Sequence, residues 1–235
     1  MRDCLKSCVS ACPKHADFRK GASPRGHVSM IKGFYKFLKV IFSKPLLWLF
    51  GMKVVGAENE PRYEEGSYLL CANHLGALDP FCIAAALWQH KLCFMAKKEL
   101  FKHKIPEKFF RSLGAYPIDR SGADVGAVKG TIRLLQEGHC TALFPQGTRC
   151  PGVHPSTTKI KSGAGLIASR ANVPVLPVLI QSKDWRVGLF HRTRIIIGKP
   201  MMPEEYLVQD EEGHVNYNEV SRRIFDRICA LEEKE

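Results

Sequence analysis

The sequence contains no uninterrupted apolar run long enough for a membrane-spanning helix, which needs about 20 residues. Its most apolar segment, residues 31–54, is interrupted by four lysines and a proline, namely Lys32, Lys36, Lys39, Lys44 and Pro45. The first 28 residues also lack the apolar stretch of a secretory signal peptide. We therefore expect neither a transmembrane helix nor a signal peptide. Internal repeats and low-complexity segments are likewise absent from the sequence.

Paired cysteines and metal-ligand motifs are also lacking. The nine cysteines are an odd number, and from residue 71 onward most of them lie in apolar runs, as small buried hydrophobic residues do. This favours a reducing, cytoplasmic compartment. Cys4, Cys8 and Cys12 recur every four residues, but no histidine or cysteine completes a familiar ligand spacing. We expect no metal and no other cofactor.

Acidic residues are scarce at the start of the chain. Residues 1–53 contain eleven Lys or Arg and two Asp, so +9 of the formal net charge of +12 lies there. Such a charge indicates anionic partners, which include nucleic acids, phosphorylated metabolites and acidic lipids. A nucleic-acid binder would interleave basic and aromatic residues along a groove. Because the charge here clusters on an amphipathic segment, we expect no nucleic-acid partner.

Three segments are predicted along the chain. Residues 1–28 are basic and dotted with Gly and Pro, which predicts a flexible tail. Residues 29–52 combine a lysine stripe at helical spacing with many aromatic rings, which favours amphipathic helices on an anionic membrane surface. A plain amphipathic helix packed on the core is the alternative. Residues 53–235 are predicted to form one α/β domain.

Short β-like runs alternate with helical ones beyond residue 52. This predicts an α/β fold with a largely parallel sheet flanked by helices. The expected strands are 53–55, 67–72, 92–96, 115–118, 140–144, 175–180 and 194–197. The expected helices are 80–89, 123–137, 163–170 and 218–233.

Chemically useful side chains follow several of these strands. In an open α/β sheet ligands bind beyond the carboxyl ends of the strands, where this sequence places His74 and Asp79, Lys97, and Arg149. A base oriented by an acid beside an anion clamp suits acyl or phosphoryl transfer to a hydroxyl. Asp79 before Pro80 is also a good helix start, so the presence of His74 and Asp79 is not by itself specific evidence for a catalytic site.

Four sequence blocks, taken in order, make the pattern specific. They are the Asn-His-(four residues)-Asp motif at 73–79, Gly-Ala-Tyr-Pro-Ile-Asp-Arg at 114–120, Phe-Pro-Gln-Gly-Thr-Arg at 144–149 and Val-Pro-Val-Leu-Pro-Val at 173–178. Together they resemble the glycerolipid acyltransferase family, and within it most closely the 1-acylglycerol-3-phosphate acyltransferases. The resemblance runs from about residue 50 to residue 200.

The resemblance implies a role for each matching residue. His74 is the expected general base and Asp79 its partner. Phosphate binding is assigned to four cations: Arg149, Lys97, Lys161 and Arg120. A supporting loop role is assigned to Asn73, Gln146, Gly147 and Thr148, and backbone N–H groups around the last two are candidates for holding an oxyanion. Gln146 departs from the Glu usual in the family, which puts in doubt any role for a carboxylate there.

The implied reaction moves a fatty acyl group from acyl-CoA or acyl carrier protein to the sn-2 hydroxyl of 1-acylglycerol 3-phosphate (lysophosphatidic acid). The product would be phosphatidic acid for phospholipid biosynthesis, made by a peripheral or monotopic protein at the cytoplasmic face of a membrane. Other acceptors within the family, another lysophospholipid or glycerol 3-phosphate, stay open. So do a thiol nucleophile at Cys150 and a non-catalytic lipid-binding module.

Overall fold

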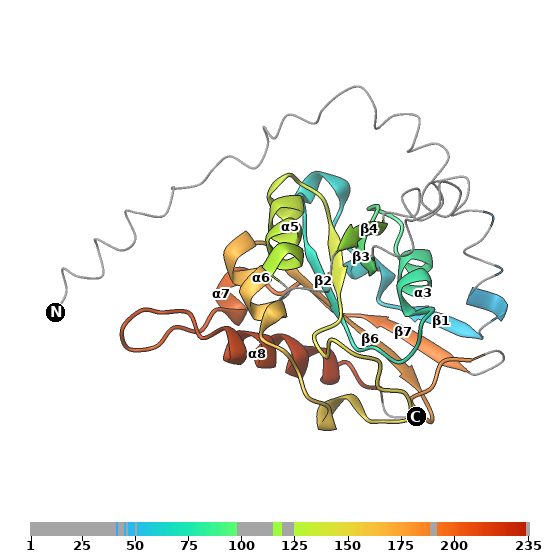
Figure 1. Cartoon of the computed structure of the whole chain (residues 1–235). Helices are drawn as coiled ribbons and strands as arrows, with labels where there is room; N and C mark the ends of the chain where they lie inside the picture. The colour runs from blue at the N-terminus through green and yellow to red at the C-terminus, as the bar shows by residue number, and fades with distance from the viewer. Residues whose placement is uncertain are drawn as a thin grey trace.

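A central sheet with helices on both faces forms the body of the molecule in the computed structural model (Figure 1). The structure describes residues 51–97, 115–118, 125–188 and 192–233, with residues 41, 45 and 47–49; the side chains of residues 95–97 and 115–118 lie outside this description. The predicted tail, 1–28, and most of the predicted membrane segment, 29–52, also lie outside the described residues.

The sheet has seven strands within the described ranges, in the order β1-β7-β6-β2-β5-β3-β4. Their bounds are Met52–Val55 (β1), Leu69–Ala72 (β2), Cys93–Lys97 (β3), Ala115–Ile118 (β4), Thr141–Leu143 (β5), Val175–Ser182 (β6) and Thr193–Ile197 (β7). Five of the six pairings are parallel, and β6 pairs with β7 antiparallel. The predicted α/β sheet is therefore present as a mixed, largely parallel sheet.

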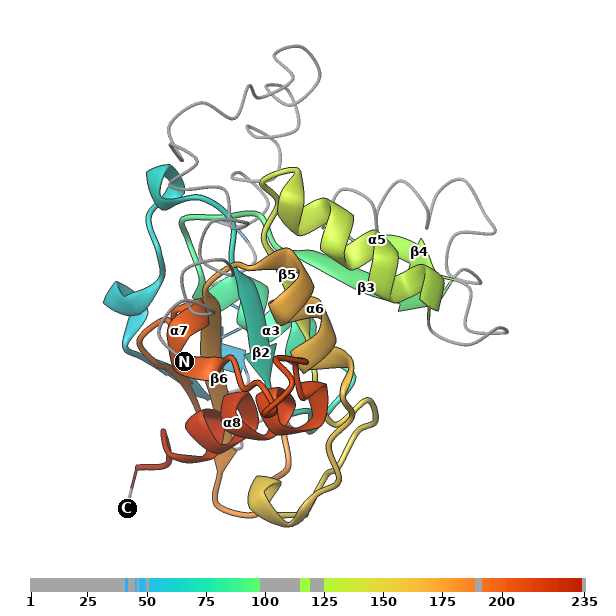
Figure 2. The same ribbon diagram turned by 90° about the vertical axis from the view of Figure 1, so that its left-hand side faces the viewer.

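Helices cover the two faces of the sheet unequally. They are α3 (Asp79–Ala86), α5 (Val125–Gln136), α6 (Gly163–Ala171), α7 (Pro203–Tyr206) and α8 (Tyr217–Cys229), with short 3-10 turns at Ala57–Asn59, Tyr63–Glu65 and Pro155–Thr157. Helix α3 packs on one face, and α5, α6 and α8 pack on the other (Figures 1 and 2). The four predicted helices correspond to α3, α5, α6 and α8, whereas α7 was not predicted.

Alternation along the strands divides the core into two clusters. In β6, Leu179 faces the cluster beneath α6 and α8, while Val178 and Ile180 face the cluster beneath α3. All eight residues of β6 are buried, as expected for a strand covered on both faces. The same two-sided burial occurs in β2. These two strands are therefore the rigid centre from which the adjacent loops emerge.

Parallel pairing brings several loops to one edge of the sheet. Cys71 of β2 lies between Leu143 of β5 and Pro177 of β6, so the carboxyl ends of β2 and β5 are level, while β6 continues in the same direction to Ser182. β3 also runs parallel to β5 and ends at the same edge. The loops that follow β2 and β5 therefore meet there, as predicted for the position of the site. No helix in the described part of the chain is long and apolar enough to cross a bilayer.

Candidate active site

The centre of the candidate site is a hydrogen bond between His74 and Asp79. His74 Nδ1 lies 2.8 Å from Asp79 Oδ2, with the histidine side chain 18% exposed and the carboxylate fully buried. The same oxygen accepts the backbone N–H groups of Leu75 at 2.6 Å and Gly76 at 2.7 Å. An ionised carboxylate only accepts hydrogen bonds, so Nδ1 carries the proton and Nε2 of the neutral ring is left as a base.

Asp79 does not serve as a helix cap. It is the first residue of α3, but its described hydrogen bonds run backwards to the loop and to His74 and not to the N–H groups of the helix. The alternative that the Asp79 side chain only caps the start of the helix is therefore wrong. The second carboxylate oxygen, Oδ1, is buried and accepts no hydrogen bond from the described residues. The two backbone donors, the N–H groups of Leu75 and Gly76, thus fix Oδ2 in position for the imidazole.

Neighbouring residues fix the backbone of the histidine loop. The Asn73 side chain makes two hydrogen bonds to Ile180 of β6, donating from Nδ2 to the carbonyl at 2.9 Å and accepting the N–H at 2.7 Å. The N–H of His74 donates to Gln146 Oε1 at 2.6 Å, and the carbonyl of His74 accepts the N–H of Cys150 at 2.8 Å. Both backbone polar groups of His74 are therefore held by the loop after β5.

Gln146 uses both ends of its amide. While Oε1 accepts from His74, Nε2 donates to Thr158 Oγ1 at 2.8 Å, and that hydroxyl donates in turn to the Pro155 carbonyl at 2.7 Å. Gln146 is 3% exposed, so these bonds are shielded from water. The departure from the family's Glu therefore fits a neutral hydrogen-bonding bridge. The role of Thr158 was not predicted, because its partner Gln146 lies twelve residues away across a loop.

An aromatic ring supports the imidazole from one side. The Phe144 and His74 rings stack with their centroids 4.0 Å apart and an interplanar angle of 14°. This contact restricts the side-chain rotation of His74. Phe144 belongs to the third sequence block, but the sequence alone does not show which way its side chain points at the end of β5.

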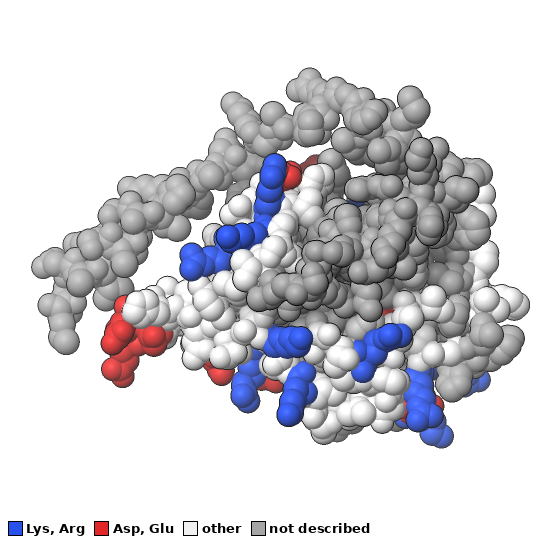
Figure 3. All heavy atoms as spheres, viewed as in Figure 1, with Lys and Arg blue, Asp and Glu red and all other residues white. Residues whose placement is uncertain are grey.

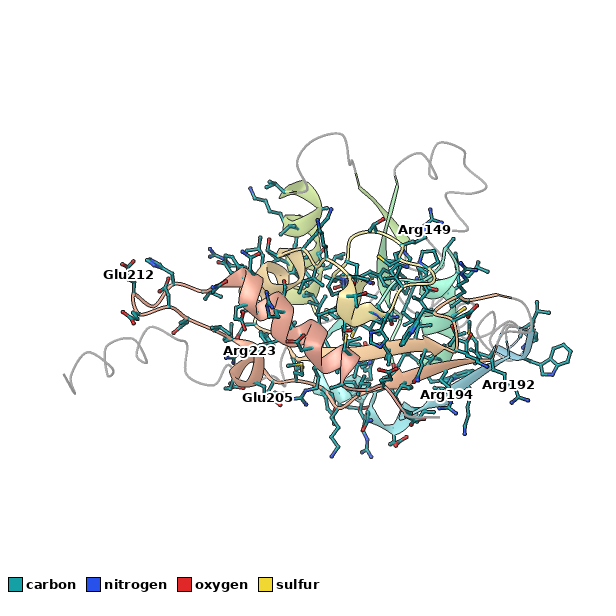
Figure 4. The ribbon with its side chains drawn as sticks, turned by 90° about the horizontal axis from the view of Figure 1, so that it is seen from below. Arg149, Arg192, Arg194, Glu205, Glu212 and Arg223 are labelled. Atoms are coloured by element: carbon teal, nitrogen blue, oxygen red, sulfur yellow. The ribbon has the colours of Figure 1, made fainter. Side chains whose placement is uncertain are left out.

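Two of the four predicted phosphate-binding cations are described with their side chains. Arg149 is exposed in the loop after β5 (Figure 4). Lys161 lies over Gly147 of the same loop, so closely that a Cβ at Gly147 would come within 2.8 Å of its Cδ and Cε atoms. Lys97 ends β3 at this edge, but its side chain lies outside the described residues, as does all of Arg120.

Gly147 is required by the geometry of this loop. Its φ of +69° is in the left-handed region that glycine favours, and Lys161 occupies the space of a side chain. The N–H of Gly147 donates to the Phe144 carbonyl at 2.9 Å. In this structure the turn uses that N–H. The expectation that backbone N–H groups around Gly147 and Thr148 hold an oxyanion stays a prediction.

The loop between β6 and β7 forms part of the surroundings and was not predicted. The Trp185 carbonyl accepts the N–H of Gly152 at 2.8 Å, and the Arg186 guanidinium lies over the same glycine. Val187 approaches Gly76 of the histidine loop, 3.9 Å from the position of a Cβ there. These contacts join segments more than thirty residues apart in sequence, so no local sequence pattern predicts them.

Cys150 contributes to the site through its backbone. Its N–H holds the His74 carbonyl, and its half-buried thiol lies 3.8 Å from the Thr148 carbonyl. A thiol nucleophile at this position stays an untested alternative. Across the described residues, no group of three or more His, Cys, Asp or Glu side chains is arranged to hold a metal ion.

Comparison with known proteins places the chain in a family of acyl-transfer enzymes. The acyltransferase family model matches residues 51–181, which is more than half of the chain. The chain therefore belongs to the acyltransferase family.

Individual relatives agree with this placement. A 1-acyl-sn-glycerol-3-phosphate acyltransferase of Bacillus subtilis is 32% identical over 178 residues, covering 73% of this chain and 84% of the relative. A protein of the same name from Streptococcus pneumoniae is also 32% identical, with 73% and 62% covered. The crystal structure of the 1-acyl-sn-glycerophosphate (LPA) acyltransferase PlsC of Thermotoga maritima matches with a TM-score of 0.63 at 25% identity, covering 88% of this chain and 81% of that one.

Proposed function

We propose that this chain transfers a fatty acyl group from a thioester donor, acyl-CoA or acyl carrier protein, to the sn-2 hydroxyl of 1-acylglycerol 3-phosphate. The product is phosphatidic acid, an intermediate of phospholipid biosynthesis. The observation that carries the proposal is the His74–Asp79 hydrogen bond of 2.8 Å. The loop that contains this pair is hydrogen-bonded to Gln146 and Cys150, in the segment that also contains Arg149. The shared name of the relatives supports the choice of acceptor.

His74 acts as the general base in this reaction. The Asp79 carboxylate accepts a hydrogen bond from the Nδ1–H group of His74, which leaves Nε2 free to accept a proton. Nε2 takes the proton of the acceptor hydroxyl as the hydroxyl oxygen attacks the thioester carbonyl carbon. The tetrahedral intermediate then collapses, the carbon–sulfur bond breaks, and His74 returns the proton to the leaving thiolate. General-base assistance of this kind contributes about 10²–10⁴ in rate. The sequence of steps uses no cofactor and no covalent enzyme intermediate.

The acceptor's phosphate is proposed to bind beside the third sequence block. Arg149 offers a planar guanidinium whose paired N–H groups match two phosphate oxygens, and Lys161 adds a second cation over Gly147. Lys97, at the end of β3, and Arg120 are proposed as further contacts. A phosphate held here would place the glycerol hydroxyl at the same edge of the sheet as His74.

The enzyme is proposed to work at the cytoplasmic face of a membrane, as a peripheral or monotopic protein. Segment 29–52 would provide the attachment, and its described end supports this: Trp48 is 78% exposed and Leu49 39% exposed. The concentration of +9 charge in residues 1–53 favours an anionic surface. The acyl chains of donor and acceptor would then remain in or near the bilayer.

An acceptor panel tests the proposal. Purified protein is incubated with acyl-CoA or acyl carrier protein thioesters and with 1-acylglycerol 3-phosphate, another lysophospholipid or glycerol 3-phosphate, and the lipid products are identified by mass. We expect phosphatidic acid from the first acceptor at the highest rate, and none with His74→Ala. Faster transfer to another acceptor would reject the proposed specificity. Transfer to no acceptor would favour the non-catalytic lipid-binding module.

A further inference from the structure

A basic cleft lies at the same edge of the sheet as the candidate active site, on the other side of β6. Its volume is about 540 Å³, and it is lined by Gly51, Lys53, Gln181, Ser182, Arg192, Thr193 and Arg194. Ser182, the last residue of β6, pairs with Thr193, the first residue of β7, which in turn pairs with Met52. Since β6 runs parallel to β2, the cleft opens at the edge that carries His74.

The register of the strands explains why this cleft is basic. Residues paired across strands point to the same face, and Lys53, Arg194 and Gln181 form one such row. Two residues earlier in β6 and two residues later in β7, Leu179 and Ile196 pair with each other and lie in the apolar cluster beneath α8. The sheet face therefore changes from apolar to polar and cationic beyond the region that α8 covers.

The cations of the cleft outnumber the acids near it. Lys53 and Arg192 are exposed, while Arg194 lies 3.4 Å from Glu233. The described hydrogen bonds of the Asp184 carboxylate are to the Ser182 hydroxyl and the Arg186 N–H. The lining also includes two neutral and buried residues, Ser182 at 5% and Thr193 at 1% exposed. An anion that enters would therefore meet a net positive charge.

Charge is also polarised across the molecule. Arg192 and Arg194 lie side by side at one end, Glu212 lies at the tip of an extension at the opposite end, and Arg149 lies apart from both (Figure 4). Acidic side chains gather at that same tip in the space-filling view (Figure 3). An anionic surface would therefore attract the end with the cleft and repel the end with Glu212.

An exposed indole lies close to the cleft in the chain. The Trp48 carbonyl accepts the N–H of Gly51, and the Gly51 carbonyl accepts the N–H of Thr193 in the cleft. Trp48 is thus joined to the cleft by a short turn, and it is 78% exposed. Tryptophan is enriched at the boundary between lipid headgroups and acyl chains. Next to a cationic cleft, it indicates a lipid surface as the partner.

We propose that the cleft formed by Lys53, Arg192 and Arg194 binds the phosphate of an anionic phospholipid at the bilayer surface, and that this headgroup is not the reacting acceptor. This headgroup contact would orient the edge of the sheet that carries His74 toward the membrane. The inference rests on the proposed function only in that the enzyme works on a membrane. The chemistry at His74 does not require the cleft to be occupied.

The test compares two sets of charge-removing substitutions. One variant carries Lys53→Gln, Arg192→Gln and Arg194→Gln, and the control carries Lys129→Gln, Lys199→Gln and Arg223→Gln, which removes the same charge from exposed sites elsewhere. Binding is measured by co-sedimentation with phosphatidylcholine vesicles with and without phosphatidylglycerol. Each cation near an anionic surface contributes a factor of about five, so the cleft variant should bind the anionic vesicles about 25- to 125-fold more weakly.

The control variant should bind within about threefold of the wild type, because charges farther than a Debye length of about 10 Å from the surface are screened. Equal binding by wild type and cleft variant, or an equal loss in both variants, would overturn the proposal. Should the Arg194 change unfold the protein, as judged by its melting temperature, the Lys53→Gln, Arg192→Gln double variant takes its place with an expected loss of about 25-fold.

Turnover of a short-chain, water-soluble acceptor separates this proposal from the proposed function. The cleft variant should retain wild-type turnover there, since no bilayer is present. A loss of turnover in the cleft variant alone would assign these cations to a substrate site and overturn the lipid-binding role. Absence of turnover even in the wild type would refute the proposed function, while the vesicle result would still decide the cleft.

Discussion

At the scale of single residues, the site depends on how few conformations are left to His74. Its N–H, its carbonyl and its Nδ1 each have a partner, and Phe144 stacks on its ring. A general base held in this way needs little further ordering when the substrate binds. The residues that hold it are therefore expected to affect turnover more than substrate affinity.

Gln146 provides the first prediction at this scale. Its Oε1 accepts the His74 N–H at 2.6 Å, and that acceptor is the part of the side chain that a glutamate would share. We expect Gln146→Leu to lower kcat at least about fivefold, because a buried N–H without a partner costs about 1–3 kcal/mol. Gln146→Glu should stay within about threefold of the wild type, since one buried acceptor replaces another.

Steady-state kinetics with both substrates varied checks this prediction. Melting temperatures of the two variants separate a displaced loop from a general loss of stability. If the Leu variant were fully active, or if the Glu variant were as impaired as Leu, the role assigned to the acceptor oxygen would be wrong.

At the scale of elements, the sequence predicts which helices and strands exist better than it predicts the residues at which they end. The strand at 115–118 is found with the predicted bounds, and β6 extends two residues beyond the prediction to pair with β7. Helix α3 ends at Ala86, not at residue 89, because the distant Glu60 carboxylate accepts the N–H groups of Trp88 and His90. A tertiary contact of this kind leaves no periodic signal in the local sequence.

The crossing of α6 and α8 gives a prediction for an element. A Cβ on Gly165 of α6 would come 2.2 Å from the Tyr217 carbonyl oxygen and 2.9 Å from Ser221 in α8, whereas nothing lies within 4 Å of one on Gly163. We expect Gly165→Ala to lower the free energy of unfolding by about 1–3 kcal/mol through overpacking. Gly163→Ala should be neutral or slightly stabilising, because alanine favours the helix by up to about 1 kcal/mol.

Denaturant unfolding of the two alanine variants measures both effects. The pair is matched because the same atoms are added to the same helix. Equal stabilities for the two variants would show that α6 and α8 are not packed as closely as described.

At the scale of the whole molecule, the site was predictable because sheet topology is regular. Parallel strands end at one edge, so the sequence blocks after β2 and β5 were expected to meet, and they do. The β6–β7 loop and the basic cleft were not predicted, because they depend on the antiparallel placement of β7 and on its pairing with β1. The pairing of two strands far apart in sequence follows from the packing of the complete chain.

Buried thiols give a prediction for the stability of the whole molecule. Burial raises the pKa of Cys82, with a smaller contribution from Asp79, and burial raises that of Cys140, each from 9.0 to about 12. The unfolded chain therefore loses these protons near pH 9 while the folded chain keeps them, so stability falls as pH rises above about 9. Between pH 8 and pH 10 we expect each thiol to cost about 1 kcal/mol.

Unfolding in denaturant at several pH values from 7 to 10 tests this expectation. The double variant Cys82→Ala, Cys140→Ala is less stable at neutral pH because of the lost packing, but its stability should fall less between pH 8 and pH 10. A decrease with pH as steep as that of the wild type would show that these thiols are not the groups responsible.

The central claim is that His74, oriented by Asp79, takes the proton of the acceptor hydroxyl. The most direct measurement is the rate of acyl transfer in His74→Ala and Asp79→Asn, with Cys150→Ala as the control for a thiol nucleophile. We predict that His74→Ala loses at least about 100-fold in kcat while its melting temperature and vesicle binding are retained. Cys150→Ala should keep its turnover. An active His74→Ala enzyme, or an inactive Cys150→Ala enzyme with intact fold, would contradict the account.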